Sequence, residues 1–171
     1  MPLSKKTILA ILFLLMMLNS NSQIKVSHLD LQKYSGKWYV ISCIPTRFDK
    51  NWSHVIESYQ VNARGNIDIF TTYKKEKNSP EKYVTSKGFP LKESNNFSWK
   101  VQFVWPFKAD YLVEEINEDY TYVVVGHPKK KFLYIMNRTG LMGKLQYEEI
   151  VKRAVERGYD TTQLHRIDQS L

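Results

Sequence analysis

The sequence predicts an all-β fold, a sandwich or a barrel, followed by one helix. Eight short segments rich in β-branched and aromatic residues follow one another between residues 38 and 137, at roughly the spacing expected of such folds. Short turns separate them, and no strand–helix–strand alternation interrupts the series. The chain has 171 residues, which favours a single domain.

Turn residues bound the predicted strands. Between the second and third strands, Asn62, Gly65 and Asn66 predict a tight turn, because Asn and Gly tolerate positive φ. Up-and-down closure of the strands into a barrel would remove the exposed sheet edges. The eight predicted strands span residues 38–41, 55–61, 67–73, 81–90, 97–104, 111–116, 120–126 and 132–137.

One amphipathic helix is predicted over residues 144–157. Its glutamates lie early and Arg157 lies late, directly before Gly158 as a C-terminal cap. We expect its apolar stripe to pack against the outside of the sheet, with a short extended segment, 163–167, after it. The stripe consists of Tyr147, Ile150, Val151, Ala154 and Val155.

The first 22 residues have the pattern of a secretory signal peptide. Lys5 and Lys6 precede an apolar run over residues 8–18, and small polar residues follow it. A run of eleven residues is short for a membrane span, which needs about 20. We therefore expect residues 1–22 to be a signal peptide and residues 23–171 to be one exported domain, periplasmic or extracellular.

Charge and cysteine content narrow the class of protein. The net charge is +8, and removing residues 1–22 leaves 23 basic against 17 acidic residues, a net charge of +6. The lysines are scattered in predicted loops and no nucleic-acid motif is present, so we expect no nucleic-acid partner. Cys43 is the single cysteine, so no internal disulfide forms. No cysteine ends the apolar run as a lipid acceptor, so we expect a soluble protein.

Three short motifs, in this order, carry a resemblance to a known family. The first is Gly36-x-Trp38 after the signal-like segment, and the second is Asp119-Tyr120 before an apolar strand. The third is the lone basic residue Arg138, which closes the last predicted strand. Together with eight strands, one helix and a short final strand, this order resembles the lipocalin family.

The resemblance is closest to apolipoprotein D and the bacterial outer-membrane lipocalins. Ile44-Pro45-Thr46-x-Phe48 and Trp105-Pro106-Phe107 are similar to segments of that subgroup. The chain departs from it in three places. Glu118 replaces the usual Thr of the second motif, and both the disulfide cysteines of animal members and the lipidated cysteine of many bacterial members are absent. This pattern resembles a bacterial member released into the periplasm or medium.

The resemblance implies an eight-stranded antiparallel up-and-down barrel, the lipocalin calyx, with the C-terminal helix outside and a short final strand. Trp38 would close one end of the barrel. Arg138 would lie across its indole, a cation–π contact worth about 0.5–2 kcal/mol. Gly36 would let the backbone approach that ring, and residues 29–34 would cover the same end.

The resemblance also implies a carrier of small hydrophobic ligands, most simply fatty acids or lysophospholipids, held in the barrel cavity. The hydroxyls of three tyrosines near the mouth would bind a carboxylate or phosphate. Arg47 and Lys108 would meet a head group or stay solvated in their loops. The expected ligand-binding residues are Tyr59, Ile69, Thr71, Val101, Phe103, Tyr111, Val113, Val123, Val125, Tyr134 and Met136.

Catalysis has little support in the sequence, and we expect no enzyme, cofactor or metal. The four histidines show no zinc-ligand spacing. Cys43 is interpreted as a small hydrophobe in a loop or at the rim. Two alternatives stay open: a barrel enzyme using Cys43, and a protein that acts through apolar open-end loops, with transient membrane-surface contact. We expect a monomer or weak homodimer. The apolar loop residues are Phe48, Trp52, Trp105 and Phe107.

Overall fold

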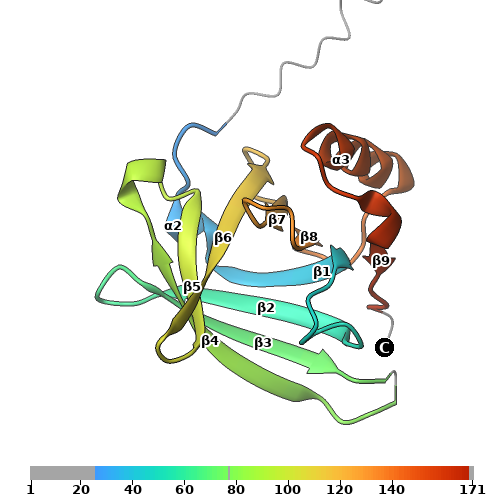
Figure 1. Ribbon diagram of the computed structural model, residues 1–171, viewed down its shortest axis with the longest axis horizontal. Coiled ribbons are helices and arrows are strands. Elements are labelled where there is room, and N and C mark those ends of the chain that lie inside the picture. The colour runs from blue at the N-terminus through green and yellow to red at the C-terminus, as the bar shows by residue number, and fades with distance from the viewer. Residues whose placement is uncertain (1–25, 77, 170–171) are drawn as a thin grey trace, which may run out of the picture.

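The computed structural model describes residues 26–76 and 78–169, so the predicted signal peptide lies outside the described part. Nine strands form one antiparallel sheet in the order β2-β3-β4-β5-β6-β7-β8-β1-β9 (Figure 1). The strands are β1 Gly36–Ile44, β2 Ser53–Val61, β3 Ile67–Lys74, β4 Lys82–Pro90, β5 Ser98–Val104, β6 Phe107–Ile116, β7 Tyr122–Gly126, β8 Leu133–Asn137 and β9 His165–Arg166.

The first eight strands close into a barrel, which confirms the predicted fold. β1 pairs with β8 on one side, and its first half also pairs with β2, where Trp38 lies opposite Glu57. The second half of β1 leaves β2 and pairs with β9 at Ser42 and Cys43. The final strand therefore occupies the edge that β2 leaves free, and the barrel is sealed most tightly at one end.

Helix α3, Lys144–Glu156, lies on the outer wall of the barrel (Figure 1). Ile150 and Ala154 are buried against outward side chains of β7 and β8. Gly158 ends the helix at φ +88°, a conformation that glycine adopts without strain. Val155 is exposed rather than part of the buried stripe. None of the helices in the described ranges is long and apolar enough to cross a membrane.

The narrow end of the barrel is closed by the first motif. Trp38 is completely buried, and its indole N–H donates to the carbonyl of Tyr34 at 2.8 Å. Tyr34 ends the short helix α2, Leu31–Tyr34, which lies under the barrel. Arg138 stacks with its Cζ 3.5 Å from the centroid of the Trp38 ring and donates to the Lys37 carbonyl at 2.8 Å.

Gly36 is required at this closed end for two reasons. Its φ is +98°, and a Cβ at this position would lie 3.3 Å from the Arg138 guanidinium. Two short 3-10 helices, η1 Lys92–Ser94 and η2 Thr161–Gln163, complete the described elements. The closed end is thus a compact plug, and the ligand site must lie above it.

Candidate ligand site in the barrel lumen

Ten of the eleven expected ligand-binding residues lie on the inner side of the barrel wall. Eight of these are buried, and seven of them belong to one apolar cluster that also contains Trp38 and Trp99. Thr71, the eighth buried residue, lies between inward Ile69 and Tyr73 on β3. The seven clustered residues are Tyr59, Ile69, Val101, Val113, Val123, Val125 and Met136, while half-buried Tyr111 and Tyr134 pack against them.

The predicted inward orientation of Phe103 is wrong. Its side chain is 62% exposed. The β5–β6 pairing shifts register between Val101 and Val104, and β4 stops pairing with β5 beyond Gln102. Inward and outward side chains alternate along β5 as far as Val101. The bulge that follows changes the direction of the later side chains, so Phe103 does not keep the inward orientation of Val101.

Three tyrosine hydroxyls form a chain inside the barrel. The Tyr34 and Tyr111 hydroxyls lie 2.8 Å apart, and the Tyr111 and Tyr59 hydroxyls lie 2.9 Å apart. The Tyr59 hydroxyl in turn donates to the carboxylate of Glu57, two residues earlier on β2. The chain runs from the closed end into the lumen, and Trp99 stacks on Tyr111 beside it at 4.9 Å between centroids.

Each tyrosine hydroxyl has a single proton, and this fixes which hydroxyl donates to which neighbour along the chain. A phenol has one O–H to donate. Since Tyr59 donates to Glu57, it accepts from Tyr111, and Tyr111 accordingly accepts from Tyr34. All three hydroxyl protons are therefore used within the protein, and the chain ends on an acceptor.

A second carboxylate lies at the rim of the lumen. Asp49, in the loop between β1 and β2, accepts the Tyr134 hydroxyl proton. Its other oxygen accepts from the Thr46 backbone N–H and hydroxyl, both at 2.7 Å. In this structure the hydroxyls expected to meet a head group donate within the protein instead: Tyr111 to Tyr59, Tyr59 to Glu57 and Tyr134 to Asp49.

Glu57 is the most unusual group in the lumen. It is half-buried on β2, in the same phase as inward Tyr59. Burial, reinforced by the charge of Asp49, raises the pKa of Glu57 to about 7, although the Tyr59 hydrogen bond opposes the rise. Glu57 is therefore a titratable carboxylate on the inner wall of the barrel.

The described cations lie away from Glu57. Arg138 stacks on Trp38 at the closed end of the barrel. Lys74 follows buried Tyr73 on β3, so it is one of the outward-facing positions of that strand. The other partly buried cations pair with carboxylates outside the lumen, and the remaining Lys and Arg side chains described are exposed. Those pairs are Lys100 with Asp110, Lys130 with Glu114, and Arg153 and Arg157 with Glu115.

Cys43 lies in the barrel wall rather than in a loop or at the rim. It is buried in strand β1, directly opposite Tyr134 of β8. Burial, with the charges of Asp49 and Glu57 adding to it, raises the pKa of the thiol to about 12. Cys43 is therefore a protonated thiol, which is a poor nucleophile and a poor metal ligand.

Aromatic side chains surround the upper lumen. Trp52 stacks on Tyr73 with 3.7 Å between ring centroids, and Phe132 packs beside Tyr134 at 5.5 Å. All four belong to or pack against the interior cluster. Within residues 26–76 and 78–169, no group of three His, Cys, Asp or Glu side chains is placed to hold a metal ion. The lumen therefore offers apolar surface, two carboxylates and a few hydroxyls.

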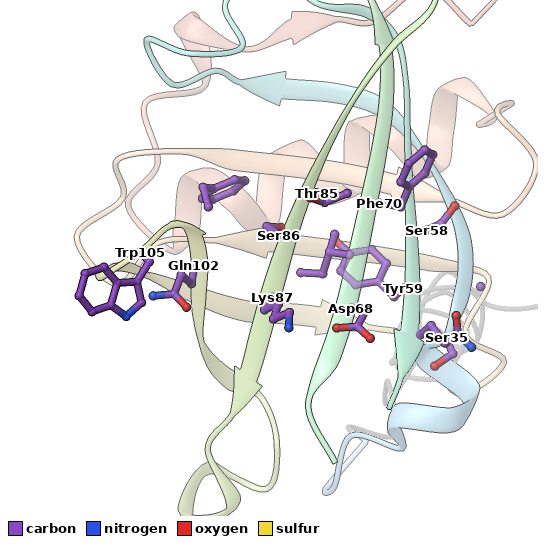
Figure 2. Close-up of a pocket in the computed structure, with 14 residues that line it drawn as sticks. Ser35, Ser58, Tyr59, Asp68, Phe70, Thr85, Ser86, Lys87, Gln102 and Trp105 are labelled. Carbon is purple, nitrogen blue, oxygen red and sulfur yellow. The ribbon is translucent and has the colours of Figure 1, made fainter. Parts of the chain in front are cut away.

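A separate depression of about 920 Å³ crosses the outer face of the sheet. Ser58, Phe70 and Thr85 form one of its walls and lie in register on β2, β3 and β4. Figure 2 shows Trp105 near one end and Ser35 near the other. This trough combines polar and aromatic side chains and lies outside the interior cluster.

Sequence reasoning missed Glu57, Asp49 and Cys43 as lumen groups. The period of two along β2 places Glu57 in the same phase as Tyr59, so this signal was available. Glutamates are mostly exposed in proteins, so Glu57 was not considered as a lumen residue. Asp49 had no such signal, because a loop has no periodicity.

Comparison with known proteins agrees with this architecture. A sequence profile described as "Lipocalin-like domain" matches residues 29–169. The chain belongs to the lipocalin family. Lipocalins bind small hydrophobic ligands. Among its relatives, this lipocalin is 32% identical to temperature-induced lipocalin-1 of Arabidopsis thaliana over 154 residues, which covers 85% of this chain and 82% of that protein.

Bacterial relatives support the predicted subgroup. The chain is 29% identical over 145 residues to the outer membrane lipoprotein Blc of Vibrio cholerae, covering 84% of this chain and 85% of that protein. Among solved structures, insecticyanin from the tobacco hornworm Manduca sexta has a TM-score of 0.67 at 15% identity, covering 85% and 84% of the two chains. The latter likeness shows the shared fold.

Proposed function

We propose that this lipocalin binds and carries a single-chain lipid, a fatty acid or a lysophospholipid, in its barrel lumen. The observation that carries the proposal is the composition of the inner wall above the Trp38 plug, which combines apolar side chains with a few polar groups. Such a wall suits an acyl chain, because burying each CH₂ stabilises a complex by about 0.8 kcal/mol. The polar groups would hold the head of the lipid.

Native mass spectrometry of the purified protein tests this proposal. We expect the barrel to retain a lipid of one acyl chain from the expression host, or to take one up after delipidation. A Val125→Trp variant, which fills the lumen from β7, is expected to lose most of that binding. A barrel that binds none of a panel of single-chain lipids would contradict the proposal.

We also propose that the protein is exported and acts in the periplasm or outside the cell. The pattern of residues 1–22 supports this location, as does the description of the Vibrio cholerae relative as an outer membrane lipoprotein. Cell fractionation and N-terminal sequencing of the purified protein would check it. A cytosolic protein that still begins at Met1 is the contrary result.

A second candidate function is contact with a membrane or protein surface through the open-end loops. Its support is the exposure of large apolar side chains there: Phe48 and Trp105 are each 82% exposed and Phe107 is 76% exposed. Vesicle flotation of the wild type and of Trp105→Ser would test this role. The enzyme alternative loses its support, because the Cys43 thiol is protonated at neutral pH.

A further inference from the structure

We infer that Glu57 sets the head-group specificity of the lumen. It selects amphiphiles whose polar end donates hydrogen bonds, an ammonium or a hydroxyl, over amphiphiles that end in a carboxylate. The inference rests on the proposed lipid-carrier function and narrows it, because a fatty acid ends in a carboxylate and becomes the disfavoured ligand. It depends on three observations: where the hydroxyl protons go, which acceptors are left, and where the cations are.

The tyrosines around Glu57 and Asp49 already donate their hydroxyl protons within the protein. Tyr34 donates to Tyr111, Tyr111 donates to Tyr59, and Tyr59 donates to Glu57. Tyr134 donates to Asp49 in the same way. A carboxylate head group accepts hydrogen bonds only, so beside Glu57 it would have to break one of these bonds to obtain a tyrosine proton.

Acceptors remain after these bonds are made. An ionised carboxylate accepts at about four positions, and the Tyr59 hydroxyl fills one of those on Glu57. Glu57 is half-buried rather than fully buried, so the other positions can accept from a head group in the lumen. An ammonium or hydroxyl placed there would make a charge-assisted hydrogen bond, which is stronger than a bond between neutral groups.

The charges of the lumen act in the same direction. Glu57 and Asp49 are both acidic, and the described Lys and Arg side chains lie outside the lumen, at its rim or below the Trp38 plug. A third carboxylate brought into this space would meet like charge in a poorly solvated site, where repulsion is strong. A cationic head group would instead be attracted.

The selectivity should depend on pH. Burial raises the pKa of Glu57 to about 7, so its negative charge, and with it the preference for a donor, develops as the pH rises through 7. The titratable and polar groups that face it come from several elements. They are Tyr34 of α2, Cys43 of β1, Asp49 of the β1–β2 loop, Tyr59 of β2, Thr71 of β3, Tyr111 of β6 and Tyr134 of β8.

Binding of three ligands of equal chain length tests the inference. Dodecylamine, dodecanol and dodecanoate are titrated by calorimetry at pH 8 into the full-length wild type, Glu57→Gln and Glu93→Gln. Glu93 is exposed on η1, so its variant removes the same charge outside the lumen. We expect the wild type and the control to bind the amine and the alcohol at least tenfold more tightly than dodecanoate. In Glu57→Gln the amine-to-carboxylate ratio should fall about tenfold.

Three outcomes overturn the inference. If dodecanoate binds the wild type as tightly as dodecylamine at pH 8, the selectivity does not exist. If Glu57→Gln and Glu93→Gln keep the same ratio, Glu57 does not set it. In both cases the barrel still binds an amphiphile and the carrier function stands, whereas failure of all three ligands to bind overturns the carrier function and the inference together.

The wild type alone provides a second measurement that needs no folded variant. Dodecanol is uncharged at every pH, so the ratio of its affinity to that of dodecanoate reports the charge in the lumen. We expect this ratio to fall at least threefold between pH 8 and pH 6, as Glu57 gains its proton. A ratio that stays constant over this range contradicts a role for Glu57.

Discussion

Two glutamates, one on the inner and one on the outer wall of the barrel, have opposite environments. Glu115 lies on the outer wall under α3, where it accepts from Arg153, Arg157 and the Tyr122 hydroxyl. Burial by itself would raise the pKa of Glu115, but these hydrogen bonds and charges lower it below its usual value. Glu57 on the inner wall has a phenol as its partner, and its pKa is raised to about 7.

The contrast separates a structural carboxylate from a candidate functional one. Two arginines and a tyrosine satisfy Glu115, which attaches α3 to the barrel. No such compensation surrounds Glu57 among the described residues, so the fold bears the cost of a carboxylate that packing does not require. Perturbed groups of this kind cluster at functional sites.

The largest expected loss of stability comes from a substitution at the closed end of the barrel. This loss is the reference for a residue with a purely structural role. Trp38→Ala should lower the free energy of unfolding by about 4 kcal/mol, because it opens a cavity and removes the contact with Arg138. Thermal melting measures this, with Trp105→Ala as the control at an 82% exposed tryptophan. Wild-type melting of Trp38→Ala would contradict the plug assignment.

Removing the charge of the outer glutamate should cost nearly as much. Glu115→Gln leaves Arg153 and Arg157 without a counter-charge beneath α3, and we expect a loss of about 3 kcal/mol. Urea unfolding at pH 7 measures the loss. If the cost is below about 0.5 kcal/mol, the two arginines are solvated and Glu115 is no anchor.

The same substitution at the inner glutamate should have the opposite sign above pH 7. Glu57 holds its proton up to a pKa of about 7 in the folded state, against 4.5 unfolded. The free energy of unfolding therefore falls as the pH rises from about 4.5 to about 7, by about 2 kcal/mol after allowing for solvent in the lumen. Glu57→Gln should lack this fall and be the more stable protein at pH 8.

The difference between variant and wild type, measured by urea unfolding at pH 5, 6, 7 and 8, isolates this contribution from the other titrating groups. Glu93→Gln is the control, because it removes the same charge at an exposed position on η1. A Glu57→Gln protein that is less stable than the wild type at pH 8 would show that the carboxylate is structural.

The smallest effects come from a matched pair of Tyr→Phe changes. Tyr122→Phe removes a 2.7 Å hydrogen bond to Glu115 and should lower stability by about 1 kcal/mol at pH 7. Tyr59→Phe removes the hydrogen bond that lowers the pKa of Glu57, so it should move the midpoint of the Glu57 titration to higher pH. NMR titration of a labelled glutamate carboxyl would detect the shift, and an unchanged midpoint would rule out that bond.

Part of the site could be predicted from the sequence because strands repeat every two residues. The phase of Ile69 or Val125 follows from this period once the buried face is known, and these residues lie inside. The prediction for Phe103 was wrong because a bulge interrupts the period, and no residue type marks that bulge in advance. The same period of two also predicts that Glu57 faces inward with Tyr59, but its charge led to a surface assignment.

By itself the sequence determined the strands and the outer helix, because these depend on local periodicity and turn residues. The resemblance that three ordered motifs carry added the closed barrel and the plug. The tertiary structure alone decided which hydroxyl donates to which acceptor, and which of two similar glutamates is compensated. Tyr34, Tyr59 and Tyr111 are far apart in the chain, and their order as donors follows only from the positions of their hydroxyls around Glu57. Head-group chemistry depends on such distances, which no spacing along the chain determines.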